Sequence, residues 1–148
     1  MATPRDGLDY SGILPKNVTF KYDSTIIFDN TKAKNSAQAG LAVTLTADDT
    51  VGLCADGDAV IGRLEIVHAG GQGGGTICSV QVRGFAKLPL GNAASVTRGN
   101  KIVGALGVAS AKGYIRGVNT ATAAELGKCD ATVMRAVDAS NNVLIDLG

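Results

Sequence analysis

The chain has 148 residues, including 20 Gly and no Trp, and 4% of its residues are aromatic while 18% are charged. This length predicts one domain with a core of its own, built from Val, Ile, Leu and Ala because large aromatic side chains are scarce. The 14 Lys and Arg against 13 Asp and Glu give a net charge of +1. Without a basic cluster or aromatic stacking platforms, this balance argues against nucleic acid as a direct partner.

The first part of the chain differs in pattern from the rest. Met1 to Lys16 is polar, has no hydrophobic period and lacks the apolar run of a signal peptide. Val18 to Phe28 alternates apolar and polar residues and is typical of a first strand. We therefore expect residues 1–37 to form an extended N-terminal arm with the first strand, and residues 38–148 to form a β-rich body. No stretch approaches the roughly 18 consecutive apolar residues of a membrane span, so no membrane contact is expected.

The body is expected to begin with a short strand and a β-hairpin. The short strand runs from Leu41 to Leu45, and the turn signal Asp56-Gly57 precedes the hairpin. The hairpin strands are expected at Ala59–Val67 and Ile77–Phe85. Their connection, residues 70–75, is rich in glycine, which is typical of an exposed linker.

A period of two in both hairpin strands predicts one buried and one solvent-facing side. Arg63, Glu65 and Gln81 share the polar parity, so we expect them to face solvent. The residues of the apolar parity, expected in the core, are Val60, Leu64, Ile66, Val80 and Val82.

The C-terminal part predicts further short strands and one short helix. The helix is expected at Thr120–Gly127, because Thr122 and Glu125 have capping-box spacing and Gly127 suits the C′ position. Short strands separated by turns predict an all-β fold, a small β-sandwich or barrel-like body with at most one short helix. The remaining strands are expected at Lys101–Val103, Tyr114–Val118, Thr132–Val137 and Val143–Leu147.

Residues suited to catalysis are few. His68 is the only histidine, and no pattern around a Ser or Cys indicates a nucleophile for it. Asp48-Asp49 and the pair Asp56 and Asp58 match no metal-binding loop, and the glycine loop lacks the Lys and the helix of a phosphate loop. We therefore expect no catalytic, cofactor-binding or metal-binding residue, no cofactor, and no enzymatic activity.

Three cysteines, Cys54, Cys78 and Cys129, are scattered along the chain without a CxxC pair. Their odd number and their apolar or strand-like surroundings indicate small buried thiols rather than a disulfide framework. A reducing site of synthesis fits this usage.

Several stretches of the body carry a resemblance to a known family. Over about residues 38–148 the chain resembles the capsid cement, or decoration, proteins of tailed bacteriophages. The stretches that carry the resemblance are Ala42–Val51, Ala55–Val67, Val80–Pro89, Val96–Val103, Cys129–Met134 and Val143–Leu147.

The resemblance implies a structural virion protein, made in the bacterial host cytoplasm, that sits on the capsid exterior. Such proteins bind where major capsid protein subunits meet, resist internal pressure, and usually act as small homo-oligomers, here a homodimer or homotrimer. We expect an oligomer to clamp several subunits by multivalency, with Met1 to Asn35 as the candidate arm for strand addition.

Two other interpretations remain open at the level of sequence. One is a tail or fibre component of the same virion. The other is a β-sandwich ligand-binding module or enzyme subunit. Carbohydrate-binding modules normally present aromatic platforms, and this chain has no Trp and only Tyr10, Tyr22 and Tyr114, which makes a module of that kind a weaker interpretation.

Overall fold

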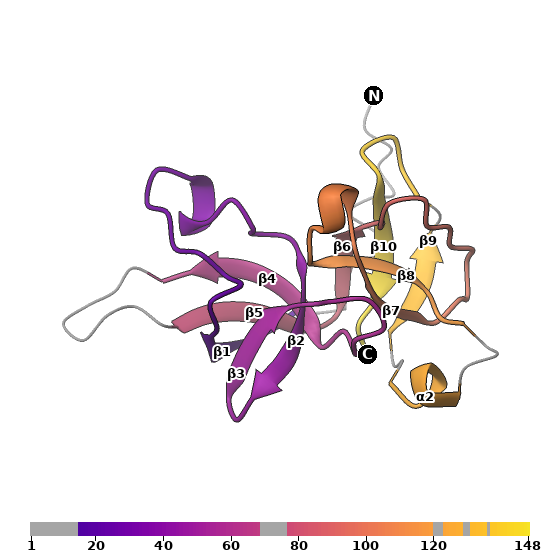
Figure 1. The fold of residues 1–148 in the computed structure, drawn as a ribbon, viewed down its shortest axis with the longest axis horizontal. Coiled ribbons are helices and arrows are strands. Elements are labelled where there is room, and N and C mark those ends of the chain that lie inside the picture. Colours follow the sequence, from indigo (N-terminus) through magenta and orange to yellow (C-terminus); the bar gives the residue numbers. More distant parts are fainter. Residues whose placement is uncertain (1–14, 69–76, 120–122, 129–130, 136) are drawn as a thin grey trace.

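The computed structural model describes residues 15–68, 77–119, 123–128, 131–135 and 137–148. Within these ranges the fold is all-β, with ten strands, one α-helical turn, α2 (Ala123–Leu126), and two short 3-10 turns, η1 (Ala33–Asn35) and η2 (Val108–Ser110). The predicted fold class is therefore confirmed. Figure 1 shows two lobes, which we call the barrel lobe (β1 to β5) and the sheet lobe (β6 to β10 with α2). No helix in the described ranges is long and apolar enough to cross a membrane.

The barrel lobe is a closed five-stranded barrel in the order β1-β3-β2-β4-β5, with β5 pairing back onto β1. Alternation of apolar and polar residues gives each strand one side for the barrel interior. Val43, Val51, Leu64 and Val80 are fully buried there. The strands are β1 (Lys16–Tyr22), β2 (Ala42–Ala47), β3 (Thr50–Leu53), β4 (Gly62–Val67) and β5 (Ile77–Arg83).

The sheet lobe contains a three-stranded sheet in the order β6-β10-β9 and a two-stranded sheet of β7 and β8. Leu88, Ile102, Ile115 and Ile145 lie at its centre and are almost completely buried. The strands are β6 (Phe85–Pro89), β7 (Ile102–Ala105), β8 (Tyr114–Gly117), β9 (Thr132–Arg135) and β10 (Asn142–Asp146).

The two lobes are joined closely. Gly84, between β5 and β6, has φ +91°, a left-handed conformation that suits glycine and lets the chain turn from one lobe into the other. Its carbonyl accepts a 2.9 Å hydrogen bond from Leu147 N. Ala42 and Cys54 lie at the ends of barrel strands but pack in the core of the sheet lobe. The cores of the two lobes therefore meet at the base of the barrel.

The predicted hairpin is confirmed, with β4 and β5 pairing antiparallel. The assignment of Ile66 to the core is wrong. Leu64 pairs with Val80 but Ile66 pairs with Ser79, so an irregularity at this point shifts the register. Val67 is fully buried, while Ile66 is only half-buried. A bulge of this kind reverses the parity of the residues beyond it.

The solvent-facing assignment of Gln81 is also wrong. Gln81 is only 5% exposed, and its Nε2 donates to Arg83 O (3.0 Å) and Phe85 O (2.8 Å). Of the residues on this parity of β5, only Gln81 is buried, since Ile77 and Arg83 are exposed and Ser79 is half-buried; the bond to Phe85 O on β6 holds Gln81 against the sheet lobe. Val82, on the other parity, packs against the barrel core as expected.

The first strand of the expected arm is part of the barrel. β1 pairs with β5 along its length and with β3 at Lys21 and Tyr22, so residues from 16 onward are joined to the body. Residues 1–14, the expected extended segment, lie outside the described residues.

The predicted helix is shorter than expected, four residues in α2. Gly127 does not adopt the left-handed conformation of a C′ glycine, and Thr122, the expected cap, lies outside the described residues. The carboxylate of Glu125 accepts a hydrogen bond from Asn119 N at 2.8 Å.

Candidate interaction surface

The only histidine forms a cross-strand pair. His68 Nε2 lies 2.9 Å from Ser79 Oγ, a distance that a Ser–His dyad would also show. Ser79 sits in the middle of β5, where it pairs with Thr19 on one side and Ile66 on the other. Among the described residues, the β5 backbone at Ser79 is therefore paired on both sides in the barrel.

The paired carboxylates point in different directions. Asp48 and Asp49 form the exposed turn between β2 and β3, where Asp49 has φ +53°. Asp58 Oδ2 accepts from Ala55 N at 2.9 Å, while Asp56 Oδ1 accepts from Arg116 Nε at 2.8 Å. No group of three or more His, Cys, Asp and Glu side chains converges as metal ligands would in the part of the chain that the structure describes.

Two of the cysteines are buried free thiols, as the sequence predicts. Burial raises the pKa of the Cys54 thiol strongly, with a smaller contribution from the charge of Asp58. Burial raises the pKa of Cys78 to about 11. Both are therefore poor nucleophiles near neutral pH. Cys129 and the glycine loop 70–75 lie outside the described residues.

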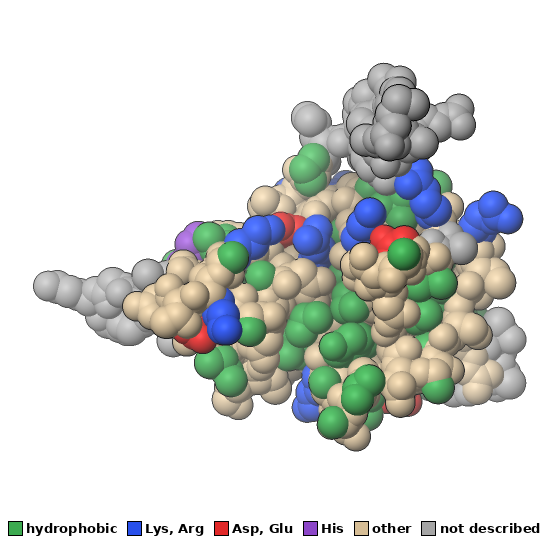
Figure 2. Space-filling model, turned by 90° about the horizontal axis from the view of Figure 1, so that it is seen from above, with side chains coloured by type: hydrophobic (Ala, Val, Ile, Leu, Met, Phe, Trp, Pro, Cys, Tyr) green, Lys and Arg blue, Asp and Glu red, His purple; other side chains and the backbone are tan. Residues whose placement is uncertain are grey.

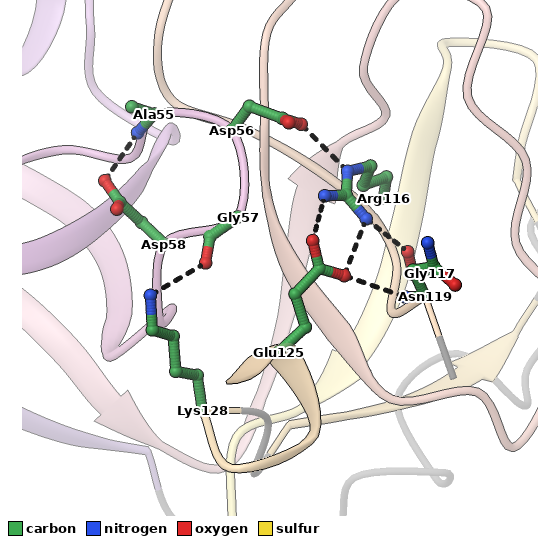
Figure 3. Close-up of polar contacts among 9 residues, drawn as sticks. All are labelled: Ala55, Asp56, Gly57, Asp58, Arg116, Gly117, Asn119, Glu125 and Lys128. Carbon is green, nitrogen blue, oxygen red and sulfur yellow. Dashed lines mark hydrogen bonds and ion pairs between the residues drawn. The ribbon is translucent and has the colours of Figure 1, made fainter. Parts of the chain in front are cut away.

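Arg116 on β8 is the centre of the densest polar cluster in Figure 3. Its Nη2 and Nη1 donate to Glu125 Oε1 (2.6 Å) and Oε2 (3.1 Å), and its Nε donates to Asp56. The hydrogen bonds from Arg116, and to a smaller extent the one from Asn119 N, lower the pKa of Glu125 to about 2. The hydrogen bonds to the carboxylates of Glu125 and Asp56 in turn raise the pKa of Arg116. This cluster ties α2 and the turn at Asp56 to β8, so its role is structural.

A groove lies where the two lobes meet. Its first part is a hollow of about 300 Å³ with an apolar floor that includes Leu144 and Phe85. A second hollow of about 310 Å³ shares two walls with it, Arg63 and Lys87. Figure 2 shows several Lys and Arg side chains gathered along one edge of the face in view, with Asp or Glu side chains among them. The residues that line the first hollow are Pro15, Arg63, Gln81, Phe85, Ala86, Lys87 and Leu144.

The cations of the groove are loosely paired. Arg63 Nη1 lies 3.6 Å from Glu65 Oε1, and Lys87 Nζ lies 3.7 Å from Asp138 Oδ2. These separations exceed hydrogen-bond distances, and exposed pairs of this kind contribute little to stability. The Nε atom of Arg63 is buried and has no hydrogen-bond partner among the described residues. A buried donor without an acceptor is costly, which makes this atom the least satisfied polar group of the groove.

Sequence reasoning did not identify the groove or the Arg116 cluster. Arg63 and Lys87 are 24 positions apart, and Asp56 and Arg116 are 60 apart (87 − 63 and 116 − 56). Such residues come together only because the two lobes pack against each other, and no local sequence pattern predicts that packing. A comparison with protein-family models, curated proteins and solved structures finds no match to this chain.

Proposed function

We propose that the protein is a capsid cement protein, which binds the outer surface of a phage shell and clamps neighbouring major capsid protein subunits. The observation that carries the proposal is the resemblance of residues 38–148 to the cement proteins, and the all-β fold of this stretch is consistent with it. Its partners are then the major capsid protein and further copies of itself, on the capsid exterior. No cofactor takes part in this function.

The mechanism is multivalent clamping. A small interface on one shell subunit is weak, but a homo-oligomer that touches several subunits raises its overall affinity through effective concentration. Each further contact then adds to retention without requiring one large interface. A dimer and a trimer both satisfy this requirement.

The barrel gives the N-terminal segment a firm anchorage. Residues 1–14 precede β1, which pairs with β5 from Lys16 to Lys21 and with β3 at its far end. A force applied to the arm along the direction of β1 is shared among the backbone hydrogen bonds that join β1 to β5 and β3, so these bonds resist it together. The arm is therefore suited to carry load between the shell and the body.

Deletion of residues 1–14 tests this role, because the deletion leaves β1 intact. We expect the shortened protein to keep its circular dichroism spectrum and melting temperature, and to be lost more readily from empty shells in co-sedimentation. Equal retention of both forms would remove the arm from the mechanism. Failure of the full chain to sediment with the shells would contradict the cement function itself.

A further inference from the structure

We propose that this chain arose by internal duplication, so that the barrel lobe and the sheet lobe are two copies of one five-stranded β-barrel. Each strand of the first copy then has a counterpart in the second: β1 in β6, β2 in β7, β3 in β8, β4 in β9 and β5 in β10. The duplication does not depend on the proposed function.

The two sheets of the sheet lobe are joined into a ring. A parallel bridge between Leu90 and Ile115 connects the end of β6 to β8, and an antiparallel bridge between Lys101 and Thr132 connects the start of β7 to β9. The order around the ring is therefore β6-β8-β7-β9-β10, with β10 pairing back onto β6. This is the order β1-β3-β2-β4-β5 of the barrel lobe, and in both rings only the first and third strands pair in parallel.

The register of the strands repeats residue by residue. Five successive pairs join β6 to β10, and they match five successive pairs that join β1 to β5. The same assignment of counterparts holds from strand to strand around both rings, except at the end of the β2–β3 ladder, where β2 skips Thr46. The end pairs of the two runs are Asn17–Gln81 and Lys21–Ile77 in the first copy, and Phe85–Asp146 and Pro89–Asn142 in the second.

An irregularity of the ladder is repeated as well. The β4–β5 register skips Glu65, and the β9–β10 register skips its counterpart, Met134. Bulges are local features that are kept within families of related proteins, so a bulge at the same place in both rings is what common descent predicts. The pairs that flank it are Leu64–Val80 and Ile66–Ser79 in the first copy, and Val133–Ile145 and Arg135–Leu144 in the second.

The turn before the second strand is also the same in both copies. Gly40 N donates to Leu64 O at 2.6 Å, and Gly99 N donates to Val133 O at 2.8 Å. Both glycines are left-handed, with φ of +94° and +85°, a conformation that suits glycine. The carbonyl of the next residue accepts in both copies, from Leu64 N at 2.9 Å and from Val133 N at 2.8 Å.

The interiors of the copies correspond, whereas the outer faces differ. Thr19 pairs with Ser79 on the first copy, but their counterparts on the second are Lys87 and Leu144. The two copies therefore share a fold and present different surfaces. Counterpart positions in the two cores hold different apolar residues, which explains why the sequence shows no repeat: Val43 and Ile102, Val51 and Ile115, Leu64 and Val133, and Val80 and Ile145.

Hydrogen exchange of the intact protein, followed for each amide by NMR, tests whether the second copy is closed like the first. The amides of Gly91 and Val133 close the second ring by donating to Ile115 O and Asn100 O, and their counterparts in the first ring are those of Asp23 and Leu64. We expect all four to exchange at least about a hundredfold more slowly than in an unstructured peptide. Fast exchange at Gly91 or Val133 would mean that the sheet lobe is open and would overturn the duplication.

Matched core exchanges test whether counterpart positions pack alike. The double variant Leu64→Val/Val80→Ile gives the first copy the residues of the second. Each single variant should lower the melting temperature by about 2–6 °C, through a cavity or through overpacking, and the double variant should lower it by less than the sum. The reciprocal variants, Val133→Leu and Ile145→Val, should show the same recovery in the second copy. Additive losses in either copy would contradict equivalent packing and overturn the duplication.

Discussion

Left-handed backbone conformations occur in this protein at residues that do not favour them. Ala93, Ala109 and Ser110 have φ of +55°, +56° and +60°. Ala93 and Val108, the neighbour of Ala109, line one hollow of the sheet lobe, and Val108 is 74% exposed. An alanine in this conformation costs about 1–2 kcal/mol because its Cβ crowds the following carbonyl. Such strain is kept where the surrounding structure imposes it.

Replacement of Ala109 by Gly should therefore stabilise the protein. Relief of the Cβ crowding outweighs the extra entropy of glycine in the unfolded chain, for a net gain of about 0.5–1 kcal/mol. The control is Ala111→Gly, because Ala111 has φ −64° and gains nothing from glycine. Thermal denaturation should show a higher midpoint for the first variant and a lower one for the second. A lower midpoint for both would mean that Ala109 is not strained.

Hydrophobic alternation predicted the hairpin strands but not the side on which each residue lies. The register shift beyond Leu64 moves Val67, not Ile66, into the core. A bulge cannot be recognised from the alternation of apolar and polar residues in a strand of only six residues. The burial of Gln81 depends on packing against the sheet lobe, which no local pattern encodes.

Gln81 supplies a direct test of that correction. Gln81→Glu removes a donor and turns a carboxylate toward the carbonyls of Arg83 and Phe85, so we expect a loss of about 1–3 kcal/mol. Thr46→Val, at an exposed position of β2, should change stability by less than about 0.5 kcal/mol. Urea denaturation compares the two. Equal and small losses of unfolding free energy in the two variants would mean that Gln81 faces solvent.

At the level of elements, α2 depends on contacts outside itself. A helix of four residues is too short to form alone. Glu125 attaches it to Arg116 on β8, and Lys128 Nζ reaches Gly57 O at 3.5 Å. The sequence indicated a short helix here, but the partner of Glu125 lies on a strand and could not be read from capping-box spacing.

This attachment gives stability a defined pH dependence. The pKa of Glu125 is lowered from 4.5 to about 2 in the folded protein. Its contribution is therefore fully present above pH 4.5 and is lost as the pH falls through about 2. Glu125→Gln should destabilise the protein at pH 6 and reduce the fall in melting temperature between pH 5 and pH 2. Parallel pH profiles for the two proteins would contradict the assignment.

At the level of the whole molecule, the sequence predicted a β-rich body but not its division into two lobes. Strand patterns give the order of strands along the chain, whereas the lobes depend on which strands pair. β1 closes the barrel by pairing with β3 and β5, contacts that are distant in sequence. The same long-range packing creates the groove, so the candidate site could not be predicted from motifs.

The proposed cement function requires many copies of this protein on a phage shell. The copy number in purified virions, measured by quantitative mass spectrometry against the major capsid protein, tests this claim most directly. A cement protein should be present in a ratio near one to one with the major capsid protein. Absence from the particles, or the few copies expected of a tail or fibre component, would contradict it.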